Sequence, residues 1–161
     1  MKKIKDLLDH IFIDGLSGMA QGLFATLIIG TIIQQIGTLI GGPRGDMIFA
    51  VGKVAAALTG AGIGVGVAAK FKESYLVVVS AATAGMVGAF ASKLLAGTVL
   101  VDGTMVFAGP GEPLGAFLAA YIGIECGHLV AGKTKVDILV TPIVTIGTGS
   151  LVGLLVGPGV S

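Results

Sequence analysis

The sequence predicts an all-α membrane protein with about five membrane-spanning helices and one short β-hairpin. Residues 15–43 contain no Asp, Glu, Lys or Arg, whereas a helix needs about 20 apolar residues to cross a hydrocarbon core of about 30 Å. Hydrophobic residues make up 54% of the chain and charged residues 12%, against about 25% charged residues in soluble proteins. Glycine supplies 28 of the 161 residues, which is typical of helices that pack closely in a membrane.

The N-terminal segment, residues 1–13, is amphipathic. Ile4, Leu7, Leu8 and Ile11 follow the i, i+3, i+4, i+7 spacing of one helix face, and the charged residues lie elsewhere. This pattern predicts a short helix that rests in the headgroup layer of the membrane. A frayed charged tail is the alternative.

The remaining residues predict five spans, so that residues 1–161 form a single membrane domain. The spans are residues 15–40, 47–69, 74–92, 114–131 and 138–156. The second and third are separated by only residues 70–73, which makes them antiparallel neighbours.

A hairpin is predicted between the third and fourth spans. Two β-prone runs, residues 98–101 and 104–107, flank the dipeptide Asp102-Gly103, which is a strong signal for a two-residue turn. Open strand edges are not tolerated in lipid. We therefore expect the hairpin outside the membrane or at its interface, the alternative being a re-entrant element buried among the helices.

The basic residues predict the orientation of the chain in the membrane. Five spans place seven basic residues on one side and three on the other. The seven are Lys2, Lys3, Lys5, Lys70, Lys72, Lys133 and Lys135, and the three are Arg44, Lys53 and Lys93. The side with seven is expected in the cytoplasm, with the N-terminus inside and the C-terminus outside. Lys53, near the start of the second span, is expected to snorkel outward.

Glu125 and His128 are ionisable residues within a predicted span, where such groups usually face a bundle interior or a water-filled cavity. Glu125 could accept a hydrogen bond from a substrate or exchange a proton. Alternatively, it could form a structural ion pair with His128, Lys133 or Lys135. His128 could contact the same substrate, or it could instead cap the end of the fourth span.

Amides and further carboxylates complete the candidate polar residues. Gln21 and Gln34, with Gln35, lie in the first span, where they could contact a sugar or hydrogen-bond to another helix. Asp14 and Asp137 are expected at the heads of the first and fifth spans, where a carboxylate interacts favourably with the helix dipole.

The glycines of the second span indicate helix packing. Gly60, Gly62, Gly64 and Gly66 form two overlapping GxxxG pairs, which would give this helix two faces of close approach. Gly18 and Gly22 form a similar pair in the first span. The spacing does not match the phosphate-binding pattern GxGxxG.

Several functions are excluded by composition. A net charge of +1 provides no basic face for nucleic acid. The single cysteine, Cys126, cannot form an internal disulfide or a CxxC redox pair. Glu125 and His128 have the E-x-x-H spacing of some metal-binding bundles, but the chain offers too few further ligands, so we expect no metal, no cofactor and no catalytic residue.

Three motifs carry a resemblance to a known family. The motifs are GMAQGLFATLIIGTIIQQIG, residues 18–37, GAGIGVGVA, residues 60–68, and TKVDILVTPIVTI, residues 134–146. Together they resemble the EIIC-like membrane proteins of the sugar phosphotransferase system, the group that includes the perfringolysin regulator protein. The likeness runs from about residue 14 to residue 158.

This resemblance implies a function. It implies alternating-access transport of a small polar solute, with a sugar as the expected solute, by a homodimer in the bacterial plasma membrane. Phosphotransfer would be carried by separate soluble EIIA- and EIIB-like partners rather than by this chain. Because members of the family continue with a second membrane half, we expect this chain to correspond to the first.

Two alternatives are retained. A rotor-ring subunit of an ion-driven ATPase also combines a glycine-rich helix with one membrane carboxylate, although such subunits contain an even number of spans. A membrane regulator or sensor without transport is the other alternative, as the family's name suggests.

Overall fold

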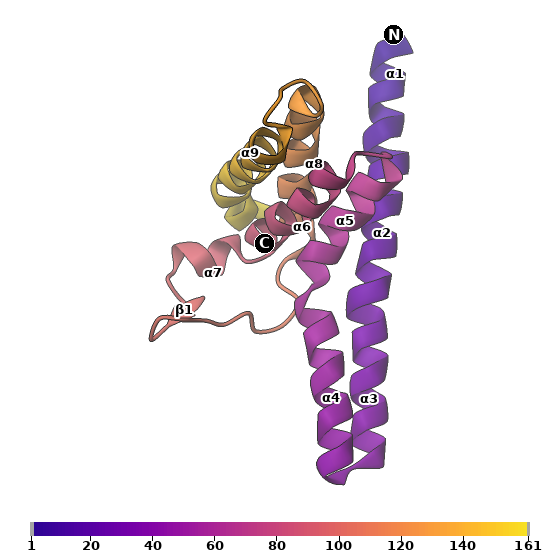
Figure 1. Ribbon diagram of the computed structural model, residues 1–161. Coiled ribbons are helices and arrows are strands. Elements are labelled where there is room, and N and C mark those ends of the chain that lie inside the picture. The colour runs from indigo at the N-terminus through magenta and orange to yellow at the C-terminus, as the bar shows by residue number, and fades with distance from the viewer. Residues whose placement is uncertain (1, 161) are drawn as a thin grey trace.

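The computed structural model describes residues 2–160 and is almost entirely helical, which confirms the predicted fold class. A single long helix covers Lys2–Ile40 and runs the full height of the molecule (Figure 1). The other helices pack beside it in two groups (Figure 1). One group packs on the lower part of the long helix and forms with it an arm that extends below the bundle, and the other group forms the bundle (Figure 1).

The long helix contains five consecutive helical segments. They are α1 (Lys2–Asp9), η1 (His10–Gly15), α2 (Leu16–Leu23), η2 (Phe24–Ile28) and α3 (Ile29–Ile40), where η1 and η2 are π-helical. The amphipathic segment is therefore joined to the first span without a break. Asp14 lies inside this helix, and the expectation that it heads a helix was wrong.

The second predicted span begins earlier than expected and is divided. It consists of α4 (Gly42–Ala57) and α5 (Thr59–Lys70), which are bent by 52° at Leu58. Leu58 has φ −89° and ψ 11°, outside the helical region, and the hydroxyl of Thr59 donates to the Ala56 carbonyl at 2.7 Å. The sequence contains no proline here, so this bend was not predicted.

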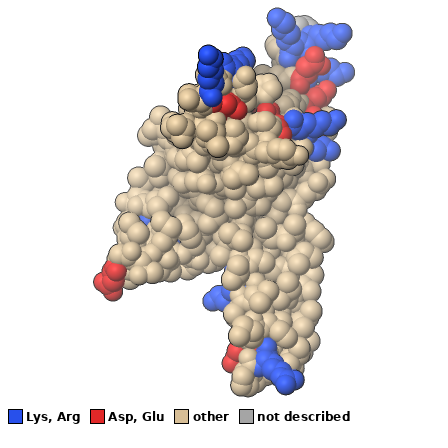
Figure 2. All heavy atoms as spheres, viewed as in Figure 1, with Lys and Arg blue, Asp and Glu red and all other residues tan. Residues whose placement is uncertain are grey.

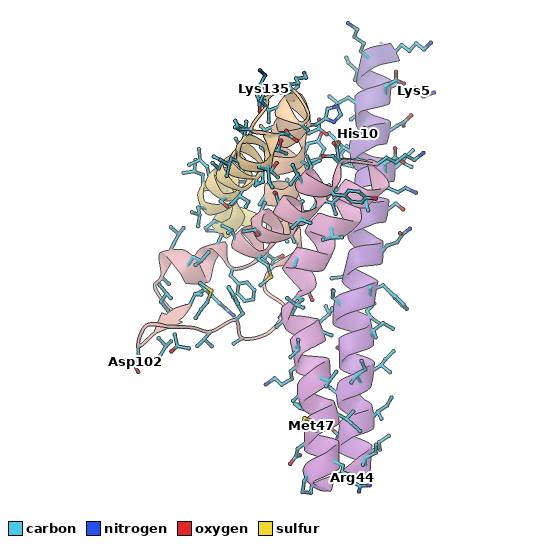
Figure 3. The ribbon with its side chains drawn as sticks, viewed as in Figure 1. Lys5, His10, Arg44, Met47, Asp102 and Lys135 are labelled. Atoms are coloured by element: carbon cyan, nitrogen blue, oxygen red, sulfur yellow. The ribbon has the colours of Figure 1, made fainter. Side chains whose placement is uncertain are left out.

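The arm consists of α3 and α4, which pack against each other through glycines. Gly30 lies against Gly52, and Gly37 lies against Gly45. A side chain at any of these four positions would meet the backbone of the other helix, so the two helices approach as closely as their backbones allow. Arg44 lies at the free tip of the arm (Figure 3).

The bundle is formed by α5, α6 (Tyr75–Ala89), α8 (Pro113–Val130) and α9 (Asp137–Val160), with the short α7 (Ala91–Leu95) beside α9. Its core consists of buried aliphatic and aromatic side chains. They include Ile63 and Val67 from α5, Val77 from α6, and Phe117 and Ile124 from α8.

The hairpin has the predicted turn. β1 (Leu100–Val101) pairs antiparallel with β2 (Thr104–Met105), with Leu100 opposite Met105. Asp102 and Gly103 have φ 52° and 76°, the positive values that a type I′ turn requires. All four strand residues are exposed, and Asp102 lies at the outer tip (Figure 3).

Three helices of the described residues are long and apolar enough to cross a membrane, namely Lys2–Ile40, Pro113–Val130 and Asp137–Gly159. The bent pair α4–α5 makes a fourth if it is counted as one span. The remaining apolar helix, α6, has 15 residues, or about 22 Å at helical rise, which is shorter than a hydrocarbon core. The predicted count of five crossings therefore requires both that the bent pair is one span and that α6 crosses the membrane.

Candidate functional site

Most charged residues gather at one end of the molecule. Figure 2 shows lysine, arginine and carboxylate side chains over the upper end, with a second, smaller group at the tip of the arm. Lys5, His10 and Lys135 lie at the upper end, and Arg44 lies at the opposite end (Figure 3). The apolar surface between them has the character of a segment embedded in lipid.

At the upper end, Glu125 is bound by a residue from the N-terminal segment. The Nε2–H of His10 donates to Glu125 Oε1 at 2.8 Å. The His10 ring also stacks on Phe71 with ring centroids 3.8 Å apart, and Tyr121 lies 6.2 Å from both rings. This His10 cluster, defined as His10, Phe71, Tyr121 and Glu125, joins the long helix, the end of α5 and α8.

His128 does not pair with Glu125; its partner is Glu73. Its Nδ1–H donates to Glu73 Oε1 at 2.8 Å, which links the end of α8 to the turn between α5 and α6. The expected alternative, an ion pair between Glu125 and His128 or the nearby lysines, was wrong because Glu125 turns toward His10.

Asp137 binds the loop that precedes its own helix. Its Oδ1 accepts the backbone N–H of Gly132 at 2.8 Å and the hydroxyl of Thr141. The carboxylate thus fixes the entry into α9 by bridging the loop and the first helical turn.

A cleft lies between the arm and the segment that follows the hairpin. Its volume is about 610 Å³. One wall consists of Leu27 of η2 and of arm residues Thr31, Gln34, Lys53, Val54, Ala56 and Ala57, and the opposite wall consists of residues 106–110. Figure 2 shows the hollow between the arm and the overhanging part of the molecule, with a basic group on the side of the arm that faces it.

The four residues predicted to contact a substrate do not form one site. Gln34 lines the cleft, whereas Glu125 and His128 belong to the charged upper end. Gln34 is 24 residues beyond His10 on the same long helix, a distance of about 36 Å at helical rise. Gln21 is exposed on that helix.

The glycines of α5 lie on two contact faces. Gly60 and Gly64 lie against Gly85 and Ala81 of α6, while Gly62 and Gly66 lie against Gly22 and Gly18 of α2. Because the two pairs alternate along α5, this one helix is in backbone contact with neighbours on both sides. Among the described residues there is no group of three or more His, Cys, Asp or Glu that could hold a metal ion.

Sequence reasoning missed three of these residues. His10 was assigned to a surface segment and Lys53 to the outer end of a span. Glu73 was correctly placed in a turn, but its partner His128 was not predicted. The sequence signal for His10 was that neither proline nor paired glycine occurs before residue 41. This absence predicts one continuous helix from the surface into the bundle.

These features define a multi-pass helical membrane protein with charged ends and a polar cleft between apolar helices. A family model described as "Phosphotransferase system, EIIC" matches residues 13–161. The chain therefore belongs to the phosphotransferase system EIIC family of membrane proteins. The match leaves the rotor-ring alternative without support. Neither the curated proteins nor the solved structures that were searched contain a match to this chain.

Proposed function

We propose that this chain is the membrane-embedded component of a sugar transporter that works by alternating access, with the cleft beside the arm as the solute pathway. Membership of the EIIC family supports transport as the function. The cleft is the observation that carries the proposal, because Thr31, Gln34 and Lys53 bring polar side chains to one hollow between otherwise apolar helices. Sugars are bound by such amides and hydroxyls through hydrogen bonds.

The architecture suggests which part moves. The arm is one rigid unit, since α3 and α4 are in backbone contact at Gly30–Gly52 and Gly37–Gly45. It meets the bundle at the bend between α4 and α5. Because α3 continues into α2 as one helix, widening or narrowing the cleft would require rotation about Leu58 together with bending of the long helix at the π-helical segment η2.

The orientation and partners follow from charge and family. The upper end, with Lys5 and Lys135, is proposed to face the cytoplasm, where soluble phosphotransferase proteins would be encountered. A homodimer in the bacterial plasma membrane is proposed as the working form. Catalytic residues for phosphotransfer are not required of this chain, because that step would occur on EIIA- and EIIB-like partners.

The test is solute uptake into proteoliposomes that contain the protein, with and without the phosphorylated soluble components. The solutes are radiolabelled neutral sugars, sugar alcohols and sugar acids. Gln34→Ala should reduce uptake about tenfold, since one lost hydrogen bond to a solute costs about 1–1.5 kcal/mol. Gln35→Ala is the matched control, because Gln35 is the adjacent exposed amide and does not line the cleft.

Two results would count against transport through this cleft. Equal uptake by the Gln34 and Gln35 variants would place the pathway elsewhere. Absence of uptake for every solute, by protein whose folding is verified, would favour the regulator without transport.

A further inference from the structure

Lys53 lies deeper in the apolar part of the molecule than the sequence suggested. It is nine residues beyond Arg44, which lies at the tip of the arm, and this corresponds to about 14 Å along α4. If the tip marks one boundary of a hydrocarbon core of about 30 Å, Lys53 is close to the middle. Its stem of four methylene groups covers only about half of the distance back to the tip.

A lysine at this depth requires either water or an opposite charge. Among the described residues, no carboxylate forms an ion pair with Lys53. The recorded neighbour of its ammonium group is the ring of Phe49, 6.0 Å from the ring centroid. Lys53 is also the one charged residue among those that line the cleft. The lining of the cleft therefore carries one positive charge and no carboxylate.

Two polar groups lie beside Lys53 in the same lining. Gln34 passes over Gly52, where a Cβ would be 2.7 Å from Gln34 Cγ, so the absence of a side chain at residue 52 makes room for the amide. No described residue hydrogen-bonds with this side-chain amide. The hydroxyl of Thr31 donates to the Leu27 carbonyl at 2.8 Å, which leaves its oxygen free to accept.

A second positive group, Lys93, lies behind the opposite wall of the cleft and is bonded to a residue of that wall. Lys93 Nζ donates to the carbonyl of Ala108 at 3.1 Å, and Ala108 belongs to the cleft lining. Lys93 itself lines a neighbouring cleft together with Glu112. Glu112 does not line the cleft that Lys53 lines.

We propose that the cleft binds an anionic solute, a sugar that carries a carboxylate or phosphate group. This inference rests on the proposed function and assigns its substrate class. Lys53 supplies the counter-charge, and the Gln34 amide and the Thr31 hydroxyl orient the uncharged hydroxyls of the sugar. A neutral sugar would leave the ammonium group of Lys53 unpaired at membrane depth, so the site discriminates against it.

The test measures the electrostatic potential of the cleft directly. Thr31→Cys is made in a Cys126→Ala background, reconstituted in zwitterionic lipid so that no anionic headgroup is present. The cysteine is labelled with membrane-impermeant methanethiosulfonates, one negatively and one positively charged. Val51→Cys is the matched control. Val51 lies on α4 at about the same height along the arm as Thr31 on α3. Its side chain is 55% exposed and does not line the cleft.

Residue 31 should react with both reagents, and its labelling rate with the anionic reagent should be about tenfold higher. The reason is that the positive charge of Lys53 raises the local concentration of the anionic reagent several-fold and lowers that of the cationic reagent several-fold. Adding Lys53→Gln should remove this preference. Residue 51 should react much more slowly. Glucuronate or glucose 6-phosphate should slow labelling at residue 31, and neither glucose nor inorganic phosphate should.

The pattern of protection separates the ligand types. Protection by glucuronate or glucose 6-phosphate but not by phosphate indicates an anionic sugar, and protection by phosphate alone would overturn the assignment of a sugar. Equal labelling rates with the two reagents would also overturn the proposal, and so would protection by glucose equal to that by glucuronate. The anions are added at about 10 mM, so that binding with a millimolar dissociation constant is still detected. No protection by any anion at this concentration would overturn the proposal as well. Anion protection without uptake would instead contradict the transport function alone.

Discussion

His10 and Glu125 are 115 positions apart in the chain and are joined by a hydrogen bond of 2.8 Å. The bond ties the first turn of the π-helical segment η1 to the last third of α8. Both side chains are partly exposed, at 35% and 41%, so solvent screens the pair and its contribution is moderate. The stacking of His10 on Phe71 adds apolar contact. The pair thus anchors the N-terminal end of the long helix to the bundle.

We predict that His10→Ala releases residues 2–14 from the bundle. The variant loses one charge-assisted hydrogen bond and one stacked ring, which together contribute about 1–2 kcal/mol. Hydrogen exchange of the backbone amides in residues 2–14 should accelerate, while exchange in α9 stays unchanged. Gln21→Ala is the control, since Gln21 is exposed on the same helix. Equal acceleration in both variants would show that the His10 cluster does not hold this segment.

We predict that Gly22→Ala destabilises the contact between the long helix and α5. A Cβ at residue 22 would overlap the backbone carbonyl of Gly62, so the two helices must separate. Overpacking of this kind costs about 1–3 kcal/mol. The measurement is the thermal unfolding midpoint of the purified protein in detergent.

Gly147→Ala is the matched control for this effect. Gly147 is also in a helix, but no atom lies within 4 Å of its added Cβ. This variant should be neutral or slightly more stable, because alanine favours the helix by about 1 kcal/mol over glycine. A loss of stability in the Gly147 variant as large as that in the Gly22 variant would refute the explanation by close approach.

Local patterns in the sequence predicted the helices and the hairpin, because both are decided by neighbouring residues. The Asp102-Gly103 turn is an example, since positive φ at two consecutive positions selects these residue types. The boundaries were less accurate where no breaker marks them. The long helix extends through residue 14 because neither proline nor paired glycine precedes residue 41.

The candidate site was less predictable, because its residues meet through tertiary packing. Glu125 was identified as unusual from its position within an apolar helix, but its partner comes from the opposite end of the chain. Gln34 and Lys53 belong to one cleft because α3 and α4 form an antiparallel hairpin and because α4 bends away from α5 at Leu58. Nothing in the sequence near residue 58 indicates this bend.

We predict that Gly103→Ala weakens the hairpin and leaves the helices intact. Alanine at φ 76° is strained by about 1–2 kcal/mol relative to glycine. The amide of Val106, which donates to Val99 at 2.7 Å beside the hairpin, should exchange faster. Asp102→Asn should behave like the unaltered protein, since asparagine also tolerates positive φ. Unchanged exchange at Val106 in the Gly103 variant would contradict this prediction.

We predict opposite effects for two threonines that are one turn apart on α9. Thr141 and Thr145 are both fully buried, but the Thr141 hydroxyl donates to Asp137. The Thr145 hydroxyl has no hydrogen-bonding partner among the described residues. Valine has nearly the same shape as threonine and lacks the hydroxyl. Thr145→Val should therefore raise stability by about 1 kcal/mol, because it removes an unpaired buried polar group.

Thr141→Val should lower the unfolding midpoint instead, because the Asp137 carboxylate loses the donor that fixes the entry into α9. The measurement is thermal unfolding of both variants in the same detergent. A double variant should show the sum of the two changes, unless the hydroxyls are coupled through the helix. Destabilisation by Thr145→Val as large as that by Thr141→Val would contradict this prediction, because it would show that the Thr145 hydroxyl is not an unpaired buried group.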